Sequence, residues 1–127
     1  MDANPALPFL EIAKEFFSSA EESLAKKKNE NSKAISLLSD GTERLLIALL
    51  YACGIEEPHD FKTFPEILIE KDSRLAEFRE FYPDLLTAGK RAKLSPAPSL
   101  KETEIENFFS PAKKFLALAE KIIEKNS

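Results

Sequence analysis

The 127-residue chain contains one cysteine, one histidine, three glycines and no tryptophan, and these shortages exclude several classes of protein. A single cysteine, Cys53, cannot form a disulfide framework or a cysteine-based zinc site. A single histidine, His59, cannot supply a pair of histidine ligands to a metal. With so few glycines, neither a P-loop nor a dinucleotide-binding fingerprint occurs. The sequence therefore predicts no metal and no cofactor.

Long apolar runs are also missing. No stretch approaches the roughly 20 apolar residues that a membrane-spanning helix needs. The N-terminus lacks the basic segment and following apolar segment of a secretory signal peptide, so we expect a cytoplasmic protein without a membrane partner. Because 43% of the residues are hydrophobic, the chain is too apolar to be a disordered tail. Its length predicts one domain over residues 1–127.

Charge is unevenly distributed along the chain, whose formal net charge is −4. Residues 56–84 include nine acids and four bases, whereas residues 85–101 include four bases and no acid. The overall acidity disfavours a dedicated nucleic-acid binder, because phosphate contacts need clustered cations. The local cluster of Lys90, Arg91 and Lys93 nevertheless makes these residues candidate contacts to RNA or to an acidic partner. The alternative is a solvated basic loop.

Apolar residues recur every three or four positions along most of the chain, which predicts helices. The spacing indicates a first helix over residues 8–28 and a second over residues 32–53, ended by Gly54. From Leu45 to Cys53 the second helix is apolar without interruption. A helix that is apolar on all sides is surrounded by other elements, so this half should lie at the centre of a bundle.

The next part of the chain predicts shorter elements. Thr63 is followed three positions later by a glutamate, which is the pattern of a capping box for a short helix over residues 64–71. Asp72 or Ser73 then caps a further helix. Pro83 should break or kink that helix, because proline lacks the amide hydrogen that a helix interior needs.

Residues 89–99, which include two prolines, are expected to form a loop. Thr103 begins a second capping-box pattern at the start of the last helix. Pro111 either kinks this helix or delays its start to near Ser110. The sequence therefore predicts an all-α fold, with an up-and-down four-helix-bundle core and a fifth short helix.

Polar residues offer three candidates for chemistry. His59 is either a general base or a residue that satisfies backbone groups near the start of a helix. Cys53 has no basic neighbour in the sequence, which favours a buried small hydrophobe over a nucleophile. Glu43 and Arg44 interrupt an apolar helix. They form either a partly exposed pair or a polar cluster that needs partners.

Several of these features follow one another in a familiar order. Residues 40–50 (DGTERLLIALL) place a charged pair before an apolar run, Gly54 ends the helix, and residues 59–61 (HDF) precede a short helix. This order resembles the HEPN domain (higher eukaryotes and prokaryotes nucleotide-binding), especially its small prokaryotic members. The likeness extends over about residues 9–123.

The resemblance implies a five-helix fold, formation of homodimers, and pairing of the toxin–antitoxin type with a minimal nucleotidyltransferase. Many HEPN proteins are metal-independent RNA endonucleases with an Arg-x(4–6)-His motif, in which the arginine positions the phosphate and the histidine transfers a proton. Arg91 lies in the matching region, but Pro96, Ala97 and Pro98 occupy the positions where the histidine would stand.

These observations favour a non-catalytic HEPN-like protein that acts by binding, as a homodimer and with a nucleotidyltransferase or RNA as partner. An alternative is a divergent RNA endonuclease that uses Arg91 together with His59. A further alternative, carried by the resemblance alone, is a nucleotide-binding regulatory module. No motif specific for DNA is present.

Overall fold

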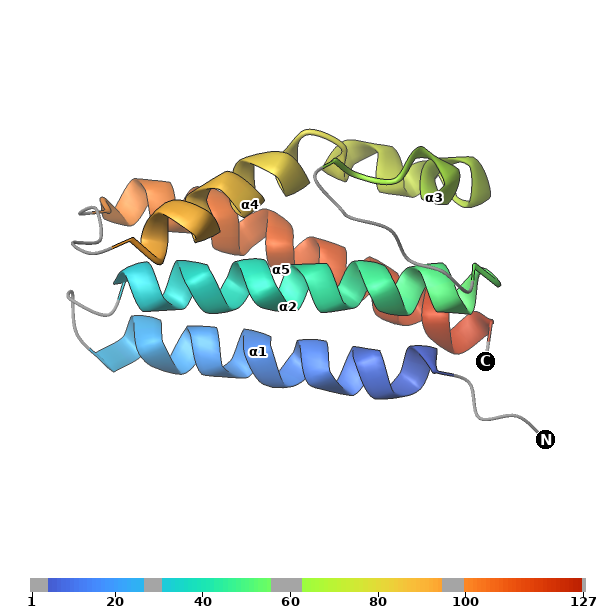
Figure 1. Cartoon of the computed structure of the whole chain (residues 1–127), viewed down its shortest axis with the longest axis horizontal. Coiled ribbons are helices and arrows are strands. Elements are labelled where there is room, and N and C mark those ends of the chain that lie inside the picture. The colour runs from blue at the N-terminus through green and yellow to red at the C-terminus, as the bar shows by residue number, and fades with distance from the viewer. Residues whose placement is uncertain (1–4, 27–30, 56–62, 95–99, 127) are drawn as a thin grey trace.

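The computed structural model describes residues 5–26, 31–55, 63–94 and 100–126, and these residues form helices and turns without a strand. The helices are α1 (Ala6–Lys26), α2 (Asn31–Ala52), α3 (Glu66–Lys71), the 3-10 helix η2 (Ser73–Phe78), α4 (Phe81–Ala92) and α5 (Glu102–Lys125). Figure 1 shows the four longer helices side by side with alternating chain direction, and α3 at one end of the molecule. The predicted all-α up-and-down bundle with a short additional helix is confirmed.

The centre of the bundle is α2, which packs against α1, α4 and α5. Between Leu45 and Leu50 every side chain except that of Ile47 is buried. The prediction that the apolar half of this helix lies at the centre is therefore confirmed for these residues. Within the described part of the chain, no helix combines the length and apolar character needed to cross a membrane.

Small residues let the neighbouring helices approach α2 closely. A Cβ atom added to Gly41 would lie 2.8 Å from Cβ of Phe16 on α1. A Cβ atom added to Gly89 on α4 would lie 2.4 Å from both Cβ and Oγ of Ser39 on α2. Real Cβ contacts are not this short, so glycine at these two positions permits the observed helix–helix distances.

The end of α2 has the predicted cap. Gly54 has a φ of +83°, the left-handed conformation that glycine adopts without steric cost. Its amide donates to the carbonyl of Tyr51 at 3.0 Å, and the amide of Ile55 donates to the carbonyl of Leu50 at 2.9 Å. These two bonds form a Schellman motif, which satisfies carbonyl groups that the helix itself leaves without partners.

The start of α3 corrects one prediction. The helix begins at Glu66 rather than at residue 64, and Pro65, not Thr63, is its N-cap, without a side-chain hydrogen bond. Proline disfavours helical backbone at the residue before it, so Phe64 is excluded from the helix. Phe64 is instead buried, with its ring 5.8 Å from that of Phe115 on α5.

Asp72 is confirmed as a cap, but the helix that follows differs from the prediction. Its carboxylate accepts from the amide of Arg74 at the start of η2. The change from η2 to α4 lies at residues 79–80, and Pro83 is the third residue of α4. The first turn of a helix has no internal acceptor for its amides, so proline is tolerated there. The expectation that Pro83 itself breaks the helix was wrong.

The predicted loop at residues 89–99 was partly wrong, because α4 continues to Ala92. Gly89 lies inside this helix as the contact residue for Ser39, not as a helix breaker. Residues 95–99 of the predicted loop lie outside the described residues. The helical conformation of Gly89 is therefore determined by packing against α2 and not by the low helix propensity of glycine.

The last helix, α5, runs without a break past Pro111, so the alternative start near Ser110 was wrong. Its N-cap is Lys101, whose amide donates to Glu104 at 3.5 Å, rather than Thr103. At Phe115 this helix meets the α3–η2 segment, because the ring of Phe78 lies 4.9 Å from that of Phe115. This aromatic contact places η2 beside the C-terminal half of α5.

Candidate functional site

The basic residues Lys90, Arg91 and Lys93 lie at one end of the bundle. Lys90 and Arg91 are exposed in the last turn of α4, and Lys93 is its C-cap. Cations at this position stabilise the negative end of the helix dipole. Lys93 also forms an ion pair with Asp40 on α2, with 2.9 Å between Nζ and Oδ1. The helix end and Asp40 offset only part of this charge, and RNA or a nucleotidyltransferase as partner of these residues stays a prediction.

The alternative of a ribonuclease based on Arg91 and His59 is not tested by the structure. Arg91 is an exposed residue on α4. His59 lies outside the described residues, so the pairing of the two side chains stays a hypothesis.

Glu43 and Arg44 are partly exposed and do not enter the core. Nη1 of Arg44 lies 3.3 Å from Oε1 of Glu43, and the two side chains are 35% and 38% exposed, respectively. The guanidinium of Arg44 also lies over the ring of Phe16 on α1, 5.6 Å from its centroid. This cation–π contact directs Arg44 along the surface where α1 and α2 meet. Of the two interpretations of Glu43, the partly exposed pair is the one found.

One side of α2 is only partly covered by other helices. Its residues follow a spacing of three, four, three and four positions, and all are of intermediate exposure: Leu37, Asp40, Arg44, Ile47 and Tyr51. We call this set the α2 stripe. Most neighbouring positions on α2 are buried against α1, α4 and α5. The stripe is therefore the side of the central helix that faces away from the bundle interior.

Helix α1 extends this surface with apolar side chains. The ring of Phe9 stacks on that of Tyr51, with 5.6 Å between centroids, and Phe16 lies beneath Arg44. Ile12, on the same side of α1, is 39% exposed. We call the α2 stripe together with these three α1 residues the α1–α2 face. The α1–α2 face groups several partly exposed aromatic and branched side chains, and such grouped apolar side chains mark interaction sites.

The sequence-based search did not identify this face as a candidate site. It treated the apolar residues of both helices as a single core pattern, although positions 37, 44 and 51 repeat every seven residues. The spacing of three and four positions was present in the sequence, but Asp40 and Arg44 stand where the seam of a coiled coil has apolar residues, so the pattern alone did not indicate a helix–helix contact. Only the positions of α4 and α5 show which side of α2 is left uncovered.

Cys53 is less buried than predicted. It is of intermediate exposure at the end of α2 and packs against the core. Burial raises the pKa of its thiol, and the nearby Lys71 opposes this shift only in part. A thiol with a raised pKa is a poor nucleophile at neutral pH, which agrees with the prediction that Cys53 is not a catalytic nucleophile.

Among the residues that the structure describes, no group of three or more histidine, cysteine or acidic side chains is arranged to hold a metal ion. Comparisons of the chain with protein-family models, with curated proteins and with solved structures found no match. The residues of the α1–α2 face are therefore the basis on which a function can be proposed.

Proposed function

We propose that this protein is a non-catalytic, HEPN-like helical module that acts by binding, and that two copies associate through the α1–α2 face. The observation that carries the proposal is the symmetry of charge and apolar character along the α2 stripe. Asp40 and Arg44 lie two positions on either side of residue 42, and Leu37 and Ile47 lie five positions on either side. The stripe is thus complementary to a second, antiparallel copy of itself.

In an antiparallel pair centred on residue 42, two residues face each other when their numbers add up to 84. Leu37 then packs on Ile47 of the second copy, and Asp40, which also contacts Lys93 of its own copy, pairs with Arg44 of the second copy. The same two contacts occur twice, as an interface with two-fold symmetry requires. In a parallel pair, Arg44 would meet Arg44, and like charges in an interface cost several kcal/mol. The charges therefore favour the antiparallel arrangement.

The available surface has the size of an ordinary interface. Helix α2 has 22 residues, which corresponds to a length of about 33 Å. Two helices side by side present a surface about 20 Å wide, so the α1–α2 face covers roughly 650 Å² in projection. Stable complexes bury about 800 Å² per partner, and side-chain relief adds to the projected area. A second copy of the chain can therefore cover the face with an ordinary amount of contact.

Charge reversal on the stripe tests the proposal. Asp40→Arg places two arginines opposite each other at both symmetric contacts, and Arg44→Asp does the same with two carboxylates. Each single variant should raise the dimer dissociation constant about 100-fold or more, because like charges replace pairs. The double variant D40R/R44D restores opposite charges and should return the dissociation constant to within about tenfold of the wild-type value.

The measurement is sedimentation equilibrium over micromolar concentrations, with far-UV circular dichroism to confirm that each variant is folded. The matched control is Glu22→Arg, which reverses an exposed charge on α1 outside the α1–α2 face and should leave association unchanged. A wild-type protein that stays monomeric at these concentrations would contradict the proposal. So would a double variant that associates no better than the single variants.

A further inference from the structure

A cleft of about 530 Å³ lies at the end of the bundle where α2 and α5 finish. Its lining includes the buried apolar side chains of Leu75 and Ile122, which are 1% and 6% exposed. Its polar lining is dominated by four cations: Lys71, Arg74, Lys121 and Lys125. The volume is in the range of sites for small molecules. Such a concentration of positive charge is unusual in a chain whose net charge is −4.

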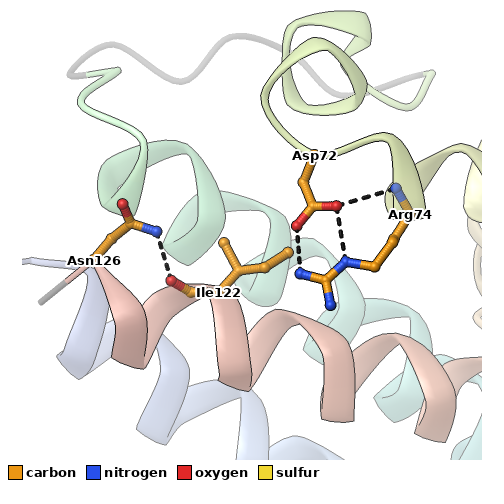
Figure 2. A network of polar contacts seen from close by, with 4 residues as sticks. All are labelled: Asp72, Arg74, Ile122 and Asn126. Atoms are coloured by element: carbon orange, nitrogen blue, oxygen red, sulfur yellow. Dashed lines mark hydrogen bonds and ion pairs between the residues drawn. The ribbon is translucent and has the colours of Figure 1, made fainter.

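Among the described residues that line the cleft, Asp72 alone carries a carboxylate, and Arg74 already occupies it. The carboxylate accepts from the Nε, Nη2 and backbone amide of Arg74 at 3.0, 2.6 and 3.1 Å. Figure 2 shows this two-pronged contact, with the third nitrogen of the guanidinium directed away from Asp72. Asp72 thus fixes the orientation of Arg74 and leaves Nη1 available to a ligand.

The three lysines of the cleft have no ion-pair partner among the described residues. Two of them lie close to the Asp72 and Cys53 side chains. Lys125 helps to lower the pKa of the Asp72 carboxyl, and Lys71 acts to lower the pKa of the Cys53 thiol. The four cations come from α3, η2 and α5 and line the same cleft.

The ends of α2 and α5 do not account for this charge. Each helix C-terminus is equivalent to about half a negative charge, so the two ends offset about one of the cations and Asp72 offsets another. Their last carbonyls already have partners. The Schellman bonds cap α2, and Nδ2 of Asn126 donates to the carbonyl of Ile122 at 2.7 Å (Figure 2). Among the described residues, about two positive charges of the cleft are left without a counter-charge.

A second cavity of the described structure shows that this lining is specific. It measures about 460 Å³, lies between α1 and α5, and has two acids, Glu21 and Glu106, against one base, Lys113. Lys113 is itself paired with Glu21 at 3.4 Å. A positively charged lining is therefore not a general property of the cavities in the described structure.

We infer that the cleft is a binding site for a small phosphorylated molecule, with the phosphate held by Arg74, Lys121 and Lys125 and the rest of the ligand against the apolar part of the lining. A phosphate group carries up to two negative charges and several acceptor oxygens, which matches the uncompensated charge and the free donors. The site is at the α2–η2–α5 end and does not involve the α1–α2 face. Phosphate binding in the cleft and self-association through the α1–α2 face can therefore be tested independently.

The test is a titration of the full chain with inorganic pyrophosphate, followed by two-dimensional amide NMR in a low-salt buffer without phosphate. We expect saturable shifts that are confined to residues around the cleft. The variant K121Q/K125Q should bind at least about tenfold more weakly, since each removes a hydrogen bond to a charged group. The control K113Q/K114Q removes the same charge from the same helix outside the cleft and should bind as the wild type does.

Three results would overturn the inference. The first is the absence of saturable shifts at millimolar pyrophosphate. The second is an equal loss of affinity in both double variants, which would indicate attraction by overall charge. The third is a set of shifts centred on another part of the surface. Neither substituted pair is part of the buried core, so both double variants are expected to fold, and their amide spectra report this directly.

Discussion

Substitution of Gly89 by alanine changes stability in two opposite directions, and the structure decides which one dominates. Gly89 lies inside α4, where alanine is favoured over glycine by up to about 1 kcal/mol of intrinsic helix propensity. The added Cβ, however, would lie 2.4 Å from Cβ and Oγ of Ser39. Relief of this contact requires α2 and α4 to separate by about 1 Å, because Ser39 is buried and its Cβ is fixed to the α2 backbone.

Overpacking of this kind costs about 1–3 kcal/mol. After the gain in propensity is subtracted, G89A should lower the free energy of unfolding by up to about 2 kcal/mol. For a domain of this length, that corresponds to a decrease in Tm of up to roughly 8 °C. If the two helices did not touch here, the same substitution would raise stability, so the sign of the effect tests the α2–α4 contact.

The assay is urea unfolding followed by circular dichroism, in a double-mutant cycle with Ser39→Gly. Apart from Ser39, the nearest atom to the added Cβ is the carbonyl oxygen of Ile35, at 4.0 Å. In the S39G background, G89A should therefore increase stability, and the coupling energy between the two sites should be about 1–3 kcal/mol. A stabilising G89A in the wild-type background, or additive effects, would refute this account of the contact.

Two further substitutions test the helix ends. Gly54→Ala should lower the free energy of unfolding by about 1–2 kcal/mol. The cost comes from the left-handed backbone alone, because a Cβ at this position meets no atom within 4 Å. Gly54→Asn should cost less in the same urea assay. Asp72→Ala should cost about 1 kcal/mol at pH 7. The hydrogen bonds from Arg74 lower the pKa of Asp72. The stabilisation by Asp72 is therefore complete above the pKa of about 4 in the unfolded chain, and it is lost as the pH falls through the lowered pKa of the folded protein. The difference between wild type and D72A should therefore narrow by pH 3, and an undiminished difference would contradict this reasoning.

Much of the fold follows from local patterns in the sequence. The apolar run of α2 and the glycine after it identify the central helix and its end, because burial and left-handed backbone are determined by these residues themselves. The errors occur where tertiary contacts override local preference. Gly89 belongs to a helix because Ser39 packs on it, and Phe64 is held outside α3 by Pro65 and by the ring of Phe115.

The candidate sites were less predictable, because they combine residues that are distant in the sequence. The cleft joins Lys71 and Arg74 to Lys121 and Lys125 across about 50 positions, and no periodicity relates them. The basic residues that do cluster in the sequence, at positions 90–93, lie at the C-terminal end of α4, where Lys93 pairs with Asp40. A partner for Lys90 and Arg91 stays a prediction.

Antiparallel association about residue 42 fixes one distance between the two copies that can be measured. A spin label at Lys33→Cys, in a Cys53→Ser background that removes the single native cysteine, marks the start of α2. In the proposed register, residue 33 of the second copy lies level with residue 51. The two labelled positions are then 18 residues apart along the helix direction, or about 27 Å, and about 10 Å apart across the contact. Pulsed dipolar spectroscopy should give a single distance near 30 Å, whereas a distance near 10 Å or no dipolar coupling at all would contradict the account.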